Sequence, residues 1–316
     1  MRGSATLTLS GCWRTLFKLG LFDGSGSLLE KWEIPTRSEN HGENLLPDIA
    51  LALLGKMAEK RIVPDEVAGV GMGVPGAVLH DSYVKPCVNL DQWGGFDVAE
   101  KLSALCKLPV KILNDANAAA LGEMSQGGGK GCQNVVFVTL GTGVGGGVIV
   151  EGSLLPGVHG AGGEIGHIKV KDGEGRRCGC GKSGCLEQYA SATGLLRSAH
   201  ELLENPNVST KLRQYNPLSC KDIFDCAKEG DSTALALVEE MCRLLGKALA
   251  AVSCVCDPEI IVVGGGVASA GEILLNGIEK AFRQYAFPAA EDTRFALASL
   301  GNDAGIFGGV RMILGA

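Results

Sequence analysis

The sequence predicts an α/β protein with two lobes and a cleft between them, and three observations support this class. The chain has 316 residues, which is more than one small core needs and enough for two compact units. Its residues are 46% hydrophobic and 5% aromatic, so the apolar content is mainly aliphatic. In each half, short apolar runs typical of strands precede segments with helical spacing, and small-molecule sites often lie between two such units.

The elements of the first half follow from turn residues and from the spacing of apolar side chains. Asp-Gly-Ser-Gly at 23–26 predicts a turn between two strands, and the apolar residues from Leu45 to Met57 recur at helical spacing. We expect strands at 18–22, 27–34, 67–74 and 110–113, and helices at 43–57, 97–107 and 116–124.

Glycine triplets divide the second half. Residues 127–129 mark a break, and residues 264–266 follow a buried strand. We find no convincing short-period repeat. We expect strands at 135–140, 147–150 and 259–263, and helices at 190–203, 218–229, 232–255 and 268–283.

The composition argues against several classes of protein. A net charge of −6 gives no reason to expect a nucleic-acid partner. The most apolar stretch, 241–256, carries Arg243 and Lys247 and is shorter than the roughly 20 residues that span a bilayer, so we expect no membrane partner. The first ten residues lack the apolar segment of a secretory signal. The 12 cysteines are therefore expected in a reducing compartment, the cytoplasm.

The strongest local signal is a set of possible zinc ligands: His167, Cys178, Cys180 and Cys185. Three thiolates and one imidazole complete a tetrahedron in many structural zinc sites. Surface thiols or disulfides are the alternative. The cysteines of this cluster are flanked by arginine, glycine and lysine, whereas buried structural thiols usually have apolar neighbours. Because no coordination position remains open, we expect structural Zn²⁺ rather than a hydrolytic metal.

Two glycine turns are candidates for phosphate binding. Residues 141–146 match G-x-G-x-x-G, but a β-branched strand follows where a dinucleotide-binding loop needs a helix. We therefore expect a strand–turn–strand whose amides and Thr142 hydroxyl face a phosphate, with an ordinary hairpin as the alternative. Residues 264–266 stand between a strand and a helix, which suits a nucleotide or, equally, close packing of strand on helix.

Three carboxylates are candidates for a polar pocket. Asp115 stands between a buried strand and a helix, where α/β active sites gather, although a helix N-cap is the commoner role. Glu164 precedes His167 by three residues, and Glu187 follows Cys185 by two. A zinc ion that holds the histidine and the cysteine would also fix these two carboxylates in space.

Together these residues resemble the ROK family of sugar kinases and repressors, from about Lys18 to the carboxyl terminus. Residues 36–50 and 287–309 look most like bacterial glucokinases. The motifs that carry the resemblance are Leu113-Asn-Asp-Ala-Asn117, Leu140-Gly-Thr-Gly-Val-Gly-Gly146, Gly163-Glu-Ile-Gly-His167 and Cys178-Gly-Cys-Gly-Lys-Ser-Gly-Cys-Leu-Glu187.

The resemblance implies an actin-like ATPase (ribonuclease H-like) fold that phosphorylates a hexose, glucose first, with ATP and Mg²⁺. It implies a small lobe of residues 1–117 with a C-terminal helix at about 302–316, and a large lobe of residues 118–301. The large lobe would carry the zinc motif and the dimerisation surface of a homodimer. N-acetylmannosamine and fructose remain alternative acceptors.

The resemblance also implies residue roles. Asp115 matches the base that accepts the proton of the sugar hydroxyl. The positions that match sugar-binding residues, besides Asp115, are Gly76, Asn89, Asn114, Glu164, His167 and Glu187. The positions that match ATP-binding residues are Thr15, Lys18, Gly141, Thr142, Gly143, Gly145, Gly264, Gly265 and Gly266.

The sequence departs from the family at its first phosphate motif, a strand that ends in Asp-x-Gly-Gly-Thr. Those places hold Gly11-Cys-Trp-Arg-Thr15, so only the threonine remains. The explanations are a shift of reading frame ahead of Lys18, a phosphate contact from Arg14, or sugar binding without turnover. In each case we expect impaired handling of ATP or Mg²⁺.

Two other classes of protein are less well supported. The repressors of the family carry a helix-turn-helix domain, which needs several helices, and about seventeen residues precede Lys18 here. An NAD-dependent oxidoreductase rests only on the G-x-G-x-x-G match and lacks the helix that should follow it.

Overall fold

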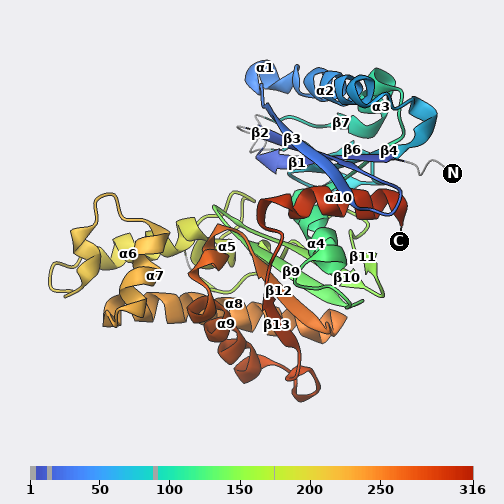
Figure 1. Ribbon diagram of the computed structural model, residues 1–316. Coiled ribbons are helices and arrows are strands. Elements are labelled where there is room, and N and C mark those ends of the chain that lie inside the picture. Colours follow the sequence, from blue (N-terminus) through green and yellow to red (C-terminus); the bar gives the residue numbers. More distant parts are fainter. Residues whose placement is uncertain (1–4, 13–15, 88–91, 174, 316) are drawn as a thin grey trace.

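Two five-stranded sheets with the same strand pattern form the framework of the molecule (Figure 1). The computed structural model describes residues 5–12, 16–87, 92–173 and 175–315. In each sheet two strands form a central antiparallel hairpin. Two further strands run parallel to the first strand of the hairpin, and another strand pairs antiparallel with its second strand. The sequence shows no short-period repeat, yet the topology repeats.

The first sheet has the order β3-β2-β1-β4-β8. Helices α2 and α3 cover one face, where apolar residues such as Leu7, Ile49 and Leu102 form a core, and α10 covers the other face (Figure 1). The bounds are β1 (Ala5–Cys12), β2 (Leu16–Phe22), β3 (Leu28–Pro35), β4 (Val67–Val74), β8 (Val110–Asn114), α1 (Glu39–Gly42), α2 (Leu45–Lys60), α3 (Val98–Cys106) and α10 (Ala304–Leu314).

A small three-stranded sheet lies beside the first one, with the order β5-β6-β7. Its strands are β5 (Val78–Leu79), β6 (Tyr83–Val84) and β7 (Phe96–Asp97). The turn between β5 and β6 is held against β8 of the first sheet, because the Ile112 backbone N–H donates to the Asp81 carbonyl at 2.7 Å.

The second sheet has the order β11-β10-β9-β12-β13. Helix α4 covers one face, and the other face packs on a layer of helices that includes α8 and α9 (Figure 1). The bounds are β9 (Val135–Leu140), β10 (Val144–Val150), β11 (Ser153–Leu154), β12 (Ile260–Gly264), β13 (Arg294–Leu297), α4 (Asp115–Gln126), α5 (Glu187–Ala190), α6 (Ala192–Leu203), α7 (Cys220–Lys228), α8 (Ser232–Cys256) and α9 (Glu272–Tyr285).

Short 3₁₀ segments connect several of these elements. They are η1 (Pro64–Glu66), η3 (Ile165–His167), η4 (Lys211–Gln214), η5 (Gly266–Ala270), η6 (Pro288–Ala290) and η7 (Gly301–Asp303). Among the described residues, no helix is both long and apolar enough to cross a membrane.

Helices α4 and α10 join the two sheets through a very close contact. A Cβ atom on Gly308 would lie 1.8 Å from the Ala118 carbonyl oxygen, and one on Gly122 would lie 2.0 Å from the Ala304 carbonyl oxygen. Larger side chains at either glycine would force the helices apart. The helix that carries Asp115 is therefore fixed against both halves of the molecule.

Three predicted elements were wrong in their extent. The helix expected at 268–283 is divided at Gly271, whose φ of 75° ends η5 before α9 begins. The helix expected at 190–203 is divided at Ser191, which is extended and caps α6. The strand expected at 147–150 begins at Val144, so the turn before it is shorter than predicted.

Candidate functional site

Asn114 prepares the start of α4, and this leaves the Asp115 side chain outside the cap. The Asn114 Oδ1 atom accepts hydrogen bonds from the backbone N–H groups of Ala116 and Asn117, at 2.9 and 3.1 Å. Its Nδ2 donates to the Gly76 carbonyl at 3.0 Å. The N-cap alternative that the sequence left open for Asp115 is therefore filled by the preceding residue.

Asp115 is the first residue of α4, and its surroundings raise the pKa of its carboxyl group. Burial raises the pKa of Asp115 to about 6, the N–H of Ala116 opposes this shift, and the nearby Glu164 adds to it. The Ala116 N–H donates to Asp115 Oδ1 at 2.8 Å, so one carboxylate oxygen is held and the other remains to meet a ligand. A carboxylate with a pKa near the working pH is suited to accept a proton.

One cavity of about 500 Å³ collects most of the predicted sugar residues. It lies where β8, the β9–β10 turn and the loop before η3 meet. Of the predicted sugar-site and phosphate-site residues it is lined by Gly76, Asn114, Asp115, Glu164, His167, Glu187, Gly141, Gly143 and Gly145. Residues of both predicted sites therefore share one cavity.

The four predicted zinc ligands converge, with one ligand atom from each side chain inside a 4.8 Å radius of the others. Cys180 Sγ lies 3.7 Å from Cys185 Sγ, and Cys178 Sγ lies 3.5 Å from His167 Nδ1. A tetrahedron built on Zn–S of about 2.3 Å and Zn–N of about 2.0–2.1 Å has edges of about 3.8 and 3.6 Å. The donor set and its spacing fit tetrahedral zinc.

His167 connects this cluster to the cavity through its two ring nitrogens. Nδ1 faces Cys178, and Nε2 lies 3.7 Å from Glu164 Oε2. A metal on Nδ1 would fix the ring, so that Nε2 presents its hydrogen to the cavity. Burial raises the pKa of Glu164, His167 opposes the rise, and Glu187 adds to it.

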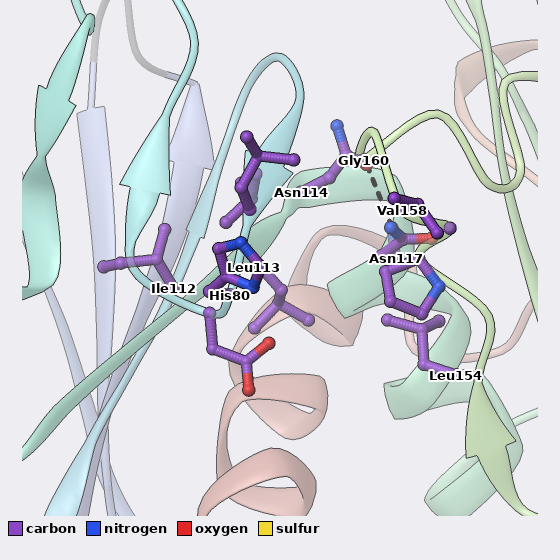
Figure 2. A pocket seen from close by; sticks show the side chains of 13 residues that line it. His80, Ile112, Leu113, Asn114, Asn117, Leu154, Val158 and Gly160 are labelled. Atoms are coloured by element: carbon purple, nitrogen blue, oxygen red, sulfur yellow. Dashed lines mark hydrogen bonds between the residues drawn. The ribbon is translucent and has the colours of Figure 1, made fainter.

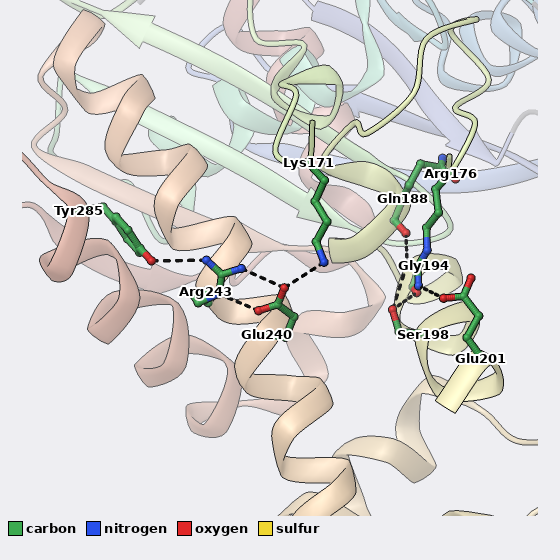
Figure 3. Close-up of polar contacts among 9 residues, drawn as sticks. All are labelled: Lys171, Arg176, Gln188, Gly194, Ser198, Glu201, Glu240, Arg243 and Tyr285. Carbon is green, nitrogen blue, oxygen red and sulfur yellow. Dashed lines mark hydrogen bonds and ion pairs between the residues drawn. The ribbon is translucent and has the colours of Figure 1, made fainter. Parts of the chain in front are cut away.

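The segment that carries the cysteines, residues 169–186, is anchored to the helices behind it, and we call it the zinc knuckle. Arg176 donates to the Gln188 carbonyl at 2.9 Å and to Ser198 Oγ at 3.0 Å, and it also pairs with Glu201 (Figure 3). Lys171 pairs with Glu240 of α8 at 3.3 Å. These contacts fix the zinc knuckle to α5, α6 and α8.

The glycines of the β9–β10 hairpin serve packing as well as the turn. Gly145 and Gly147 lie in β10, where added Cβ atoms would come within 3.0 Å of Ala116 and 2.6 Å of Ala120 on α4. The turn itself is residues 141–143, which is shorter than the predicted phosphate turn 141–146. The close approach of α4 therefore explains why glycines continue from the turn into β10.

A second cavity of about 560 Å³ lies on the other side of this turn. It is lined by Gly141, Thr142, Ala192, Cys220, Lys221, Phe224, Asp225, Lys228, Gly266, Val267, Ser269 and Ala270. Sequence reasoning found three of these residues and missed those of α7. The capping box of Ser219 and Asp222 predicts where α7 begins, but no motif predicts what its face meets.

The remaining predicted nucleotide residues lie elsewhere. Gly264 is the buried end of β12, and Cβ atoms on Gly264 and Gly265 would press on Phe137 and on the Leu140 carbonyl, so the packing alternative describes both. Lys18 forms ion pairs with Asp303 at 3.4 Å and Glu33 at 3.8 Å. Thr15, and Asn89 of the predicted sugar site, lie outside the described residues.

A third cavity of about 440 Å³ lies on the far side of Asn114 (Figure 2). Its walls are mainly apolar and come from the β5–β6 turn, β8, α4 and residues 154–160. Asn114 and Asn117 connect it to the start of α4. Asn114 lines this cavity and the one that contains Asp115, and three hydrogen bonds hold its side chain.

Two sheets of the same strand order are joined by the close contact of α4 and α10, and glycine turns line the cavities. This arrangement is the actin-like ATPase fold. The family model for the ROK family matches residues 13–315. The chain belongs to the ROK family.

The chain is similar along nearly its whole length to glucokinases. It is 42% identical to a glucokinase of Halalkalibacterium halodurans, over 93% of this chain and 91% of that protein. A ROK family glucokinase from Streptomyces griseus in complex with glucose and AMPPNP superposes with a TM-score of 0.76 at 33% identity, with 98% of each chain covered. The ROK hexokinase of Thermus thermophilus superposes at 0.81 with 32% identity, over 97% of this chain and 96% of that one.

Proposed function

We propose that this protein is an ATP-dependent hexose kinase that converts glucose to glucose 6-phosphate. The observation that carries the proposal is Asp115, a carboxylate of raised pKa in one cavity with Glu164, His167, Glu187 and the β9–β10 turn. The glucokinase relatives and the glucose and AMPPNP of the Streptomyces griseus structure support glucose and ATP as the substrates.

The reaction requires positioning more than covalent catalysis by the protein. The sugar hydroxyl oxygen attacks the γ-phosphorus of ATP, the bond from that phosphorus to its bridging oxygen breaks, and ADP leaves. Asp115 takes the proton of the hydroxyl. Each of the other sugar hydroxyls is both a donor and an acceptor. They are held by Asn114, Glu164, Glu187 and the Nε2 atom of His167.

The nucleotide lies along the glycine turn in this proposal. Backbone amides of residues 141–143 face its phosphates, with Gly145 behind them, and Gly266 lines the adenosine side together with α7. Lys18 lies on β2 of the opposite hairpin. The family's acid position is held by Gly11, which has no side chain, so this chain offers no carboxylate to Mg²⁺ there.

Zinc has a structural role in this proposal. The ion bound by His167, Cys178, Cys180 and Cys185 would fix the imidazole that faces the sugar. We expect one zinc per chain by elemental analysis of protein purified without added metal. A Cys180→Ser, Cys185→Ser variant should lose the metal, and metal-free wild-type protein of full activity would contradict the role.

The test is sugar-dependent release of ADP, followed by a coupled assay. We expect glucose to exceed N-acetylmannosamine and fructose, and Asp115→Asn to lower kcat by about 10²–10⁴-fold, since it removes only the base. The amide retains an oxygen for the Ala116 N–H, so the fold should persist. Equal rates in wild type and Asp115→Asn would overturn the assignment.

A sugar-binding protein without turnover is the second candidate, favoured by the absence of the first phosphate motif at residues 11–15. It would bind glucose in calorimetry and release no ADP. For either function we propose a cytoplasmic homodimer, on the family resemblance. Its two lobes would be residues 1–117 together with about 302–316, and residues 118–301. Light scattering will measure the oligomeric state.

A further inference from the structure

Glu187 contacts both the zinc knuckle and the glycine turn. It is the first residue of α5 and follows the zinc ligand Cys185 by two positions. Its Oε2 atom accepts a hydrogen bond from the Val144 backbone N–H at 3.1 Å, and its Oε1 atom lies 3.6 Å from Cys178 Sγ. One side chain therefore spans the distance from the metal cluster to the end of the turn.

Gly143 leaves room for this contact. An added Cβ on Gly143 would lie 2.4 Å from Glu187 Oε2, which is closer than van der Waals contact allows. Gly143 is not among the glycines of positive φ, so space rather than backbone conformation demands glycine here. Gly141, in the same turn, has no atom within 4 Å of its added Cβ and provides a matched comparison.

The other end of the turn is held by the same helical segment. The Ala192 backbone N–H donates to the Gly141 carbonyl at 2.8 Å, at the start of α6. Within the turn, the Gly141 N–H donates to the Gly143 carbonyl at 3.0 Å. Because Arg176 fixes the zinc knuckle to Gln188 and Ser198, the zinc knuckle, α5, α6 and the turn form one connected unit (Figure 3).

We infer that Glu187 is a positioning residue for the nucleotide: it holds the turn 141–143 at the phosphates and ties nucleotide affinity to the state of the zinc knuckle. The inference rests on the proposed kinase function and extends it. A sugar contact by Glu187 alone would leave nucleotide affinity independent of the zinc knuckle. The geometry instead gives this carboxylate a partner on the nucleotide side.

The first experiment measures binding of AMPPNP by calorimetry, in the absence of sugar. We expect Glu187→Ala to raise its Kd about tenfold, as for loss of one hydrogen bond to a charged group. Glu187→Gln keeps an oxygen for the Val144 N–H and should remain within about threefold of wild type, because a neutral hydrogen bond is weaker than a charged one. Zinc content and circular dichroism of both variants show whether the fold and the metal persist.

The second experiment is a double-mutant cycle between positions 143 and 187. Gly143→Ala should weaken AMPPNP binding about tenfold in the wild-type background, because its methyl group displaces Glu187. In the Glu187→Ala background the same substitution should have little further effect, because the obstructing carboxylate is gone. Gly141→Ala, the matched control, should have the same effect in both backgrounds.

The outcomes separate this inference from the proposed function. An unchanged Kd in Glu187→Ala, additive effects at 143 and 187, or wild-type protein that does not bind AMPPNP would each overturn the inference. Coupled effects on AMPPNP binding in a protein that releases no ADP with glucose would support the inference and overturn the kinase. Removal of zinc by a chelator should reproduce the Glu187→Ala value of Kd, and an unchanged Kd there would overturn the link to the zinc knuckle.

Discussion

The hairpins β1–β2 and β9–β10 occupy the same place in two sheets of the same order, but they are built differently. The buried residues of β9 that face α4, Val135 and Phe137, are apolar. In β1, Thr6 and Thr8 are fully buried, and their Oγ1 atoms have no hydrogen-bond partner among the described residues. One topology is thus formed by a well-adapted strand and by one that carries unpaired polar groups.

The turns of the two hairpins differ in the same direction. Residues 141–143 present bare backbone to two cavities. The sequence between β1 and β2 includes Trp13 and Arg14, which lie outside the described residues. Because successive exposed backbone N–H groups form anion-binding sites, we expect nucleotide binding to rely more on the second hairpin than on the first.

Restoring the first hairpin should give the largest effect. We expect the triple variant Gly11→Asp, Trp13→Gly, Arg14→Gly to raise kcat/KM for ATP by about 100-fold, since two bare amides and a carboxylate become available to the phosphates and their metal. The measurement is ADP release at saturating glucose. A variant no faster than wild type would show that the two hairpins are not functionally matched.

The pH dependence of kcat tests the role of Asp115 on the sugar side of the site, separately from the altered first hairpin. Since the pKa of Asp115 is raised to about 6 and the base must be ionised, kcat should fall about tenfold per pH unit below 6 and level off above 7. Glu164→Gln removes a neighbouring negative charge, so its acidic limb should move to lower pH. A profile flat from pH 5 to 7 would contradict the role of Asp115.

The smallest effect concerns stability and tests the buried hydroxyls. Thr8→Val removes an unpaired polar group at nearly constant shape and should raise the free energy of unfolding by about 1 kcal/mol. The reciprocal change in the other hairpin, Val135→Thr on the face toward α4, should lower it by about 1–3 kcal/mol, because it buries a hydroxyl without a partner. Urea denaturation at pH 7 measures both, and equal effects of the same sign would refute the comparison.

The fold could be predicted largely because its longer elements have clear patterns. The buried stripe of α2 and the strand–helix succession at Asp115 have one interpretation each. The strands of the small sheet are two residues long, which is too short to show a period, and β1 went unrecognised although Leu7 and Leu9 alternate with polar residues. The division of the helix predicted at 268–283 depends on the backbone conformation of Gly271 alone.

The site was predictable where its residues are close in the sequence. The four predicted zinc ligands lie within residues 167–185 of the sequence, and one ligand atom from each lies within 4.8 Å of the others in the structure. The face of α7 that lines the second cavity comes from a distant segment, and its residues form no motif. The contact of Glu187 with the Val144 N–H could not be predicted, because a backbone donor leaves no mark in a sequence.

The position of α10 also bears on the order in which the chain is made. Helix α10 lies on the first sheet (Figure 1). Its Phe307 ring packs edge-on against Phe22, with 5.4 Å between ring centroids, and Gly309 lies against the Gly71 carbonyl. During synthesis on a ribosome the residues of that sheet emerge well before the helix that covers its second face. That face of the sheet therefore stays uncovered while the whole second sheet is being made.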